Sequence, residues 1–301
     1  MKRILITGAT GLVGQEIAKQ CLPKGVEIHY LTTRKNQIQN NTTYKGFYWN
    51  PKLGEIDRAC FKGVDAIINL AGATISKRWT TSYKNEVLNS RINSLRLLRA
   101  TIIQYNIPIK QLISASAIGN YPSSYDKVYD EETTQVAISF LGEVVKQWEK
   151  EIQLFSDLNI KITIVRVGLV LAKNGGALPK IITPIKMGIG TNFGNGKQWQ
   201  SWIHIEDLAK LFLHLFNNKI EGIYNGVAPH PVTNSQMTKT IAEQLKKPLF
   251  LPAIPKVMMQ LMLGEMHILL FESQNVSSEK IEASGFEFQF KTLGEALNNL
   301  I

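Results

Sequence analysis

The sequence predicts an α/β fold in which a doubly wound parallel sheet is joined to a smaller C-terminal lobe. Three observations support this prediction. The chain opens with an apolar strand, a glycine-rich turn and an amphipathic helix. Strand and helix patterns then alternate as far as residue 167, which is typical of parallel strands connected by crossover helices. Beyond residue 167 glycines and prolines become frequent, as expected of a loop-rich lobe over the carboxyl ends of the strands.

The first strand is followed by a turn with three glycines. Residues 4–6 form the continuous apolar run that a strand buried on both faces requires. Gly8 permits a sharp turn, Gly11 lets the backbone approach a ligand, and Gly14 lets the helix pack close to the strand. Because the helix N-terminus presents free N–H groups, this spacing predicts a turn that binds the pyrophosphate of a dinucleotide. The expected contacts are Gly8, Thr10, Gly11, Leu12, Val13 and Gly14.

The second expected strand, residues 26–31, ends in a basic segment instead of an acidic one. Where an NAD-binding chain places a carboxylate against the ribose, about 20 residues after the glycine turn, this chain has Thr33, Arg34 and Lys35. A guanidinium binds a phosphate bidentately, so the segment favours the 2′-phosphate of NADP. The alternative is that Arg34 and Lys35 are solvated charges at a strand end. We expect NADP as the cofactor, with Thr33 and Arg34 among its contacts.

The remaining elements of the sheet follow in order. We expect strands over residues 64–70, 110–114 and 160–167, and helices over residues 82–105 and 139–158. Residues 202–217 have the pattern of a strand end followed by a helix. These assignments predict a Rossmann-type NADP-binding domain in residues 1–167, with residues 201–222 returning to it. Residues 168–200 and 223–301 then form the smaller substrate lobe.

Composition and charge argue against several classes of protein. Of the 301 residues 44% are hydrophobic, which is enough for a sizeable core. The formal net charge is +10, but the 34 Lys and Arg residues are scattered, so we expect no nucleic-acid partner. No apolar run is long enough to cross a membrane. The two cysteines lack metal-ligand spacing, which predicts a reduced, cytoplasmic protein without a metal site.

Short motifs along the whole chain resemble those of the extended short-chain dehydrogenase/reductase superfamily, which includes the sugar-nucleotide epimerases and dehydratases. The resemblance is closer to one branch, the epimerase family proteins of bacteria and animals. In chain order the motifs are TGATGLVG (residues 7–14), NLAG (69–72), RW (78–79), SR (90–91), SASAIG (114–119), WE (148–149), GGAL (175–178), SWIHIEDL (201–208), NGVAP (225–229) and GE (264–265). Their order and spacing together make the resemblance specific.

The resemblance implies further site residues. The strand end that lines the path of the adenosine and pyrophosphate corresponds to Leu70, Ala71 and Gly72, although a buried strand with a small-residue turn is the alternative. Ser116 matches the hydroxyl that polarises a substrate carbonyl. The same strand end brings Ser114 beside the expected nicotinamide. Arg78 is a candidate phosphate contact, with a solvent-facing salt bridge as the alternative.

The chain departs from the superfamily at the catalytic helix. Active members place a Tyr four residues before a Lys there, and the Lys lowers the pKa of the Tyr so that it transfers a proton at neutral pH. The corresponding residues here are Leu141 and Val145, neither of which transfers a proton, and no YxxxK occurs. The candidate substitutes are Tyr121, Tyr125, Glu143, Arg91 and His204. Tyr121 comes first, because its loop can fold over the nicotinamide, whereas a structural role is expected for His204.

Two functions are compatible with these residues. The first is an NADP-binding oxidoreductase or epimerase acting on a carbonyl or hydroxyl carbon of an unknown substrate, such as a nucleotide sugar, with Ser116 and Tyr121 as catalytic residues. The second is a non-catalytic NADP-binding module that senses the cofactor or binds a partner. The methionine-rich segment 254–271 has the spacing of a packing helix, and a substrate lid or a homodimer contact are its alternatives.

Overall fold

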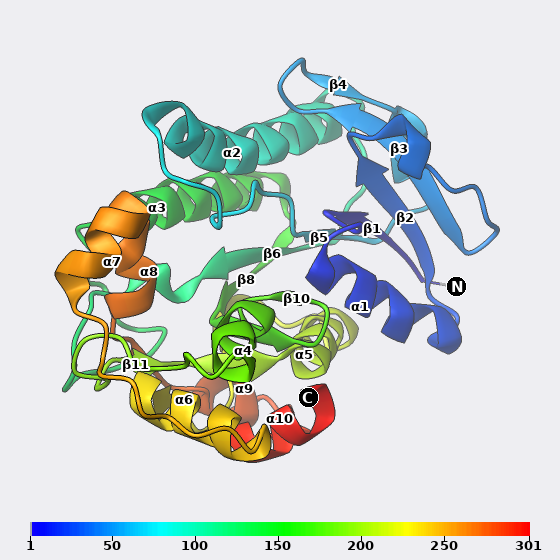
Figure 1. Ribbon diagram of the computed structural model, residues 1–301. Helices are drawn as coiled ribbons and strands as arrows, with labels where there is room; N and C mark the ends of the chain where they lie inside the picture. The colour runs from blue at the N-terminus through cyan, green and yellow to red at the C-terminus, as the bar shows by residue number, and fades with distance from the viewer. Residues whose placement is uncertain (1) are drawn as a thin grey trace.

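The structure, a computed structural model that describes residues 2–301, is built on an eight-stranded sheet (Figure 1). The strand order is β13-β8-β6-β5-β1-β2-β3-β4, and all neighbours are parallel except β3 and β4. The strands are β1 (Arg3–Thr7), β2 (Glu27–Thr32), β3 (Tyr44–Asn50), β4 (Glu55–Ile56), β5 (Ala66–Asn69), β6 (Gln111–Ala117), β8 (Lys161–Val167) and β13 (Gly222–Gly226). Because β2 and β3 lie on one side of β1 and β5, β6 and β8 on the other, the predicted doubly wound parallel sheet is confirmed.

Helices cover both faces of the sheet. In Figure 1, α2 (Thr81–Gln104) and α3 (Phe140–Gln153) lie on one face, and α1 (Leu12–Cys21) and α5 (Ile205–Asn217) on the other. The side chains of β1 alternate between these layers. Ile4 and Ile6 belong to the apolar cluster with α1 and α5, whereas Leu5 belongs to the cluster with α2 and α3. The uninterrupted apolar run of the first strand is therefore explained by burial on both faces.

The starts of these helices lie at the same edge of the sheet, where the parallel strands end. The Thr80 hydroxyl caps α2 by accepting the Tyr83 N–H, and the Ser139 hydroxyl caps α3 by accepting the Gly142 N–H. By contrast, α1 begins at Gly11 without a side-chain cap. We call this side of the sheet the carboxyl edge. It comprises the ends of β1, β2, β5, β6 and β8 and the segments that follow them.

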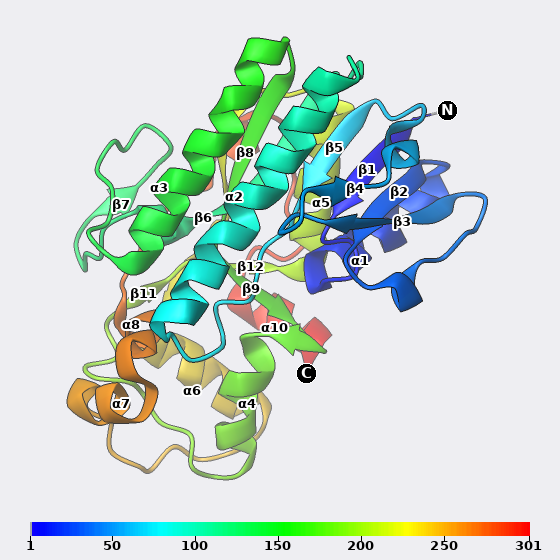
Figure 2. The same cartoon turned by 90° about the horizontal axis from the view of Figure 1, so that it is seen from above.

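The second lobe lies beyond the carboxyl edge, as the view from above shows (Figure 2). Its largest sheet has the order β10-β9-β12, with β9 (Leu169–Ala172), β10 (Gly175–Gly176) and β12 (Trp202–His204). Two smaller sheets pair β11 (Trp199–Gln200) with β14 (Val232–Thr233) and β7 (Val128–Tyr129) with β15 (Asn275–Val276). The helices are α4 (Leu178–Lys186), α6 (Asn234–Gln244), α7 (Lys256–Leu263), α8 (Ile268–Phe271), α9 (Glu279–Ala283) and α10 (Leu293–Leu300). A separate apolar cluster lies between α4, α6 and α10.

The expected boundary at residue 222 is wrong in one respect. The strand β13 (Gly222–Gly226) pairs in parallel with β8, so the returning segment extends four residues further into the sheet than we expected. Part of the C-terminal region also packs on the sheet. Ile281, Phe286 and Phe288 join the apolar cluster of α1 and α5. Residues 223–301 therefore contribute to both parts of the molecule.

The methionine-rich segment forms α7, a short 3-10 turn (Gly264–His267) and α8. Met259 is buried, whereas Met258, Leu261 and Met262 are exposed. The expected core packing is therefore found at Met259 but not along the outer face of α7. Within residues 2–301, no helix is long and apolar enough to cross a membrane.

Candidate functional site

The turn between β1 and α1 has two glycines that the fold itself requires. Gly8 has a φ of 71°, and a Cβ there would lie 2.7 Å from the Leu70 carbonyl oxygen. A Cβ on Gly14 would lie 2.5 Å from the Gly8 carbonyl oxygen. Gly11 differs, because it is exposed and its Cβ would meet only that oxygen, at 3.2 Å. The backbone at Gly11 is therefore exposed at the uncapped start of α1, as anion binding requires. Thr10 is exposed beside it, and Leu12 and Val13 form the first turn of the helix.

A buried hydrogen-bond chain joins the three central strands at the carboxyl edge. The Thr7 hydroxyl donates to Asn69 Oδ1 at 2.7 Å, and Asn69 Nδ2 donates to the Ser114 hydroxyl at 2.9 Å. The Thr7 oxygen also accepts the N–H groups of Leu70 and Ala71. Ser114 is fully buried and occupied by these contacts. Its hydroxyl thus ties β6 to β5, and its expected contact with the cofactor stays a prediction.

The end of β2 presents a free cation. Thr33 and Arg34 are both exposed, and within residues 2–301 the Arg34 guanidinium makes no hydrogen bond or salt bridge. Lys35 lies over the ring of Tyr48, with its Nζ 4.9 Å from the ring centre. No carboxylate occurs between the last residue of β2 and Lys35. The positive charge expected to recognise a 2′-phosphate is therefore available.

Arg91 is a second cation at this edge, and its guanidinium has no acidic partner within residues 2–301. Its Nη1 donates to the carbonyl oxygens of Val87 (2.8 Å) and Ala73 (3.2 Å), and its Cζ lies 4.9 Å from the Trp148 ring centre. Burial lowers the pKa of Arg91 to about 10, so it is still a cation at neutral pH. A Cβ on Gly72 would lie 3.0 Å from Arg91 Cζ. The role of Arg91 as a substitute acid stays a prediction, and a half-buried cation without an acidic partner beside the NLAG turn also suits an anion.

Arg78 lies in the exposed segment between β5 and α2. Within residues 2–301 its side chain makes no salt bridge, so the solvent-facing ion pair that was the alternative is absent. The neighbouring Trp79 is buried against the Phe140 ring at the start of α3. This contact anchors the segment, and the phosphate contact of Arg78 stays a prediction.

Ser116 belongs to a second buried network. Its hydroxyl donates to Glu149 Oε1 at 2.6 Å, and Arg166 Nε and Nη2 donate to the two Glu149 oxygens at 3.0 and 2.9 Å. Burial would lower the pKa of Arg166, but the hydrogen bonds and charge of Glu149 raise it above its ordinary value. The sequence reasoning missed Glu149 and Arg166 as partners of Ser116. The signal that could have revealed them is Arg166 itself, because a charged residue inside the apolar strand 160–167 indicates a buried ion pair.

Tyr121, in the segment that follows β6, is the far end of this network. Its side chain is 0% exposed. Arg166 Nη1 donates to its hydroxyl at 3.0 Å, and the hydroxyl donates to Asn225 Oδ1 at 2.8 Å. Burial raises the pKa of Tyr121, and the charge of Arg166 opposes this only in part. The expected position of Tyr121 above the nicotinamide is therefore wrong, and its hydroxyl is fixed inside the protein.

The helix α3 carries no proton-transferring side chain at the two positions that the resemblance assigns to the Tyr and Lys. Leu141 and Val145 are both buried apolar side chains. Glu143 lies on the exposed face, where its Oε1 accepts a hydrogen bond from Gln147 Nε2. Tyr125 is half-exposed in the loop after β6, and its carbonyl oxygen accepts the Trp199 Nε1–H. Neither of these two candidates is held against Ser116 by a hydrogen bond.

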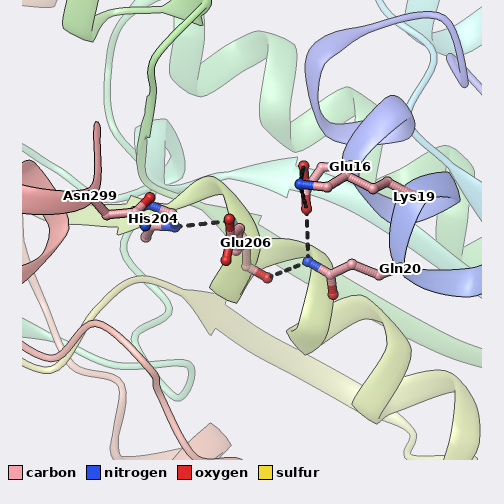
Figure 3. A network of polar contacts seen from close by, with 6 residues as sticks. All are labelled: Glu16, Lys19, Gln20, His204, Glu206 and Asn299. Atoms are coloured by element: carbon pink, nitrogen blue, oxygen red, sulfur yellow. Dashed lines mark hydrogen bonds and ion pairs between the residues drawn. The ribbon is translucent and has the colours of Figure 1, made fainter. Parts of the chain in front are cut away.

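His204 has the structural role that we expected. Figure 3 shows its ring between Asn299 and the start of α5. Its Nδ1 accepts the Glu206 N–H at 3.1 Å, so the ring proton lies on Nε2, which donates to Asn299 Oδ1 at 3.1 Å. The same figure shows Gln20 of α1 donating to the Glu206 carbonyl oxygen and to Glu16 Oε1. Burial lowers the pKa of His204, which keeps the ring neutral and suited to capping.

Among the contacts between the second lobe and the sheet domain, two lie on opposite sides of the carboxyl edge. The β9–β10 turn packs on the start of α1, because a Cβ on Gly175 would lie 3.1 Å from Leu12 Cδ1. On the other side, Lys84 of α2 forms an ion pair with Glu265 in the turn before α8. The turn that follows β1 and the helix that follows β5 are therefore both adjacent to the lobe.

The chain matches the profile of the NAD dependent epimerase/dehydratase family over residues 4–226. The protein belongs to this family. Residues 254–300, from just before α7 to α10, match a domain of unknown function, DUF1731. The matched region contains the turn after β1, the NLAG strand end and the strand that carries Ser116. The resemblance seen in the sequence is confirmed.

Relatives of this epimerase/dehydratase family member match along its whole length. An epimerase family protein of Staphylococcus aureus (strain MRSA252) is 37% identical over 302 residues, covering 100% of this chain and 99% of the relative. The crystal structure of the human epimerase family protein SDR39U1 (isoform 2) with NADPH has a TM-score of 0.87 at 30% identity, covering 99% of this chain and 98% of that chain. A nucleoside-diphosphate sugar epimerase from Corynebacterium glutamicum has a TM-score of 0.79 at 26% identity, covering 99% of this chain and 58% of that chain.

Proposed function

We propose that this family member binds NADP(H) in preference to NAD(H) and acts on a carbonyl or hydroxyl carbon of its substrate. The observation that supports it best is Arg34, an exposed guanidinium without a protein partner in residues 2–301, directly after β2. An NAD-binding chain would place a carboxylate near this position, and such a carboxylate would repel a 2′-phosphate. The human relative crystallised with NADPH supports the same preference.

The residues of the carboxyl edge fit the rest of a dinucleotide. Gly11 leaves the backbone exposed at the uncapped start of α1, which suits the pyrophosphate. Arg91 is a half-buried cation without an acidic partner in residues 2–301, and Gly72 places no side chain against it. A phosphate or another electron-rich group of the ligand would compensate this charge. Arg78 and Thr33 are exposed at the same edge and would complete the contacts.

When bound, the nicotinamide takes up or returns a hydride at the reacting carbon. The protein's part is to hold the substrate. The Ser116 proton is donated to Glu149, whose two oxygens are in turn held by Arg166. Because its proton is committed to Glu149, the Ser116 oxygen is left to accept a hydrogen bond, as from a substrate hydroxyl. This orientation favours a hydroxyl substrate over a carbonyl in the state that the structure describes.

A nucleotide sugar is the substrate class suggested by the Corynebacterium glutamicum neighbour, which is described as a nucleoside-diphosphate sugar epimerase. Leu141 and Val145 leave the two positions of α3 that the resemblance assigns to the Tyr and Lys without an acid or base, so we expect little turnover of ordinary sugar nucleotides. The same two residues favour a second candidate function, a non-catalytic module that senses NADP(H). A nucleotide sugar that changes the absorbance of bound reduced nicotinamide would support the enzyme, and binding of NADP(H) without any such change would support the sensor.

Calorimetric titration of NADPH and NADH tests the proposed preference. We expect Arg34→Ala to weaken NADPH binding by about 10- to 100-fold, the loss typical of one charge-assisted contact, while leaving NADH binding nearly unchanged. Lys24→Ala is the matched control, because it removes the same charge after the C-terminal end of α1, away from the carboxyl edge. Equal NADPH and NADH affinities of the unchanged protein would refute the preference.

A homodimer and a cytoplasmic location stay predictions of the sequence. The exposed outer face of α7, with Met258, Leu261 and Met262, is where substitutions would report on self-association. Sedimentation equilibrium of the purified protein distinguishes a monomer from a dimer directly.

A further inference from the structure

The β9–β10 hairpin of the second lobe reaches the turn that is expected to bind the pyrophosphate. A Cβ on Gly175 would lie 3.1 Å from Leu12 Cδ1, and a Cβ on Gly176 would lie 3.4 Å from Leu12 Cδ2. Leu12 is the first residue of α1 and follows Gly11 directly. The views in Figures 1 and 2 agree that this hairpin lies beside the first turn of α1. The second lobe is therefore in contact with the turn that the cofactor would bind.

The two glycines of the hairpin allow this close contact. A side chain at Gly175 would displace either the hairpin or Leu12, because 3.1 Å is shorter than an ordinary contact between carbon atoms. Gly176 has a φ of 70°, a left-handed conformation that other residues adopt only at a cost. The glycine pair therefore lets the backbone of the second lobe approach the start of α1.

The hairpin is also firmly attached to its own lobe. Its strand β10 pairs with β9 in the antiparallel direction, and β9 pairs in parallel with β12. On either side of the tip, Leu171 and Leu178 are fully buried in the apolar cluster between α4, α6 and α10. The packing of the lobe therefore sets the position of the hairpin tip beside α1.

The tip of the hairpin presents a cation. Lys173 and Asn174 are the two residues between β9 and β10, and both are exposed. Within residues 2–301, neither side chain makes a hydrogen bond, and Lys173 makes no ion pair. Lys173 is two residues from Gly175, which contacts Leu12. Because a lysine side chain extends about 6 Å beyond its Cα, its ammonium group has the first turn of α1 within reach.

The charges around the hairpin favour an anion at this place. Residues 158–205 contain no Asp or Glu, so this part of the chain carries only positive charge. The acidic residues of α1 and α5, which pack beside the hairpin, do not neutralise Lys173. Glu16 is already in an ion pair within α1, and the buried Asp207 accepts two backbone N–H groups. Glu206 forms no ion pair with Lys173 within residues 2–301.

We propose that the β9–β10 hairpin is part of the cofactor site and that the Lys173 ammonium binds the pyrophosphate of the dinucleotide. This inference rests on the proposed function. The N–H groups of Leu12 and Val13 make no hydrogen bond within residues 2–301, so the start of α1 binds one side of the pyrophosphate. The helix end supplies only about half an elementary charge, whereas each phosphate carries a full negative charge. Lys173 compensates the remainder from the side of the second lobe, so the dinucleotide joins the two parts of the molecule.

Calorimetric titration with NADPH and with NADH tests this contact. Both dinucleotides contain the pyrophosphate, whereas only NADPH has the 2′-phosphate. We therefore expect Lys173→Ala to weaken both by the same factor, about 5- to 20-fold for one charge pair in a partly solvated site, unlike Arg34→Ala. Lys180→Ala is the matched control, because it removes the same charge from an exposed position of α4 in the same lobe. That control is expected to bind both dinucleotides as the unchanged protein does.

A second variant tests the approach of the hairpin itself. Gly175→Val should weaken the binding of both dinucleotides, because the new side chain pushes the hairpin away from Leu12. In a chain that also carries Leu12→Ala, the same substitution should cost less, since the side chain that it meets is shorter.

The outcomes separate this inference from the proposed function. Failure of the unchanged protein to bind either dinucleotide would overturn the proposed function. If Lys173→Ala bound both as the unchanged protein does, lost affinity for NADPH alone, or lost no more than Lys180→Ala, the role of Lys173 would be overturned and the cofactor preference would remain. Unchanged binding of both dinucleotides by Gly175→Val would likewise overturn the part of the hairpin in the site.

Discussion

The ion pair between Glu149 and Arg166 is the contact on which the Ser116 end of β6 depends, and Glu149→Gln tests this directly. The side chains of Arg166 and Glu149 are 6% and 13% exposed. Glu149 accepts one hydrogen bond from Ser116 and two from Arg166. The substituted amide offers one acceptor oxygen and places an NH2 group against the guanidinium, which leaves a buried cation without its counter-charge.

The magnitude follows from this geometry. Removing one partner of a buried ion pair typically costs about 3 to 5 kcal/mol of the free energy of unfolding. Glu151→Gln is the matched control on the same helix, because Glu151 pairs with Arg96, whose side chain is 64% exposed. Such a surface pair contributes about 1 kcal/mol or less. The two Glu→Gln variants should therefore differ by about 2 kcal/mol or more.

Urea unfolding followed by the fluorescence of the five tryptophans measures both variants. The double variant of Glu149 and Arg166 to Gln should cost less than the sum of the single variants, because both lose the same contacts. If Glu149→Gln and Glu151→Gln were equally stable to within about 0.5 kcal/mol, the ion pair would not support the Ser116 network and the reasoning would be refuted.

Three further predictions concern other parts of the structure and use the same unfolding measurement. Gly14→Ala should destabilise the protein strongly, since its Cβ would lie 2.5 Å from the Gly8 carbonyl oxygen. The control Gly294→Ala should be neutral or stabilising, because a Cβ there meets nothing within 4 Å. Equal stabilities of the two variants would contradict this. Asp207→Ala should cost about 2 kcal/mol or more, because its buried carboxylate accepts two backbone N–H groups of the segment before α10; a cost below about 0.5 kcal/mol would show that water replaces it. Glu272 has a pKa above its unfolded value of 4.5, so the folded state binds its proton more tightly and stability falls as the pH rises from about 4.5 through about 7. Glu272→Gln should therefore be more stable than the unchanged protein at pH 8 but not at pH 4, and the opposite order would contradict the raised pKa.

Much of the fold was predictable because its signals are local in the chain. The apolar run before Gly8 and the helix after Gly11 identify a buried parallel strand and its turn, and both lie where expected. The strand β3 (Tyr44–Asn50) was not predicted, since its Lys45, Gly46 and Asn50 interrupt the apolar pattern. Lying near the edge of the sheet, it needs less apolar burial than a central strand.

The site was predictable in its residue types but less so in the directions of its side chains. Ser114 and Ser116 are two residues apart on β6, which predicts a shared face, but the partners that occupy them lie on other strands and on α3. Tyr121 follows Ser116 closely in the sequence, yet it turns inward to Arg166, which is 45 residues away. Such long-range contacts leave no periodic pattern in the sequence.

Glu272 shows the same limit most clearly. Nothing around FES at residues 271–273 distinguishes this carboxylate from an exposed loop residue. The segment is held in place by Ser273 and Gln274, which bind a loop about 150 residues earlier in the chain. Only the fold brings these two segments together.

A crystal structure of the protein with NADPH tests the central claim most directly. The account predicts the pyrophosphate at the start of α1 beside Gly11, and the 2′-phosphate within about 3 Å of the Arg34 guanidinium nitrogens. It also predicts that the Arg91 guanidinium contacts the bound dinucleotide near Gly72. A cofactor bound elsewhere, or a 2′-phosphate directed into solvent with Arg34 turned away from it, would contradict the account.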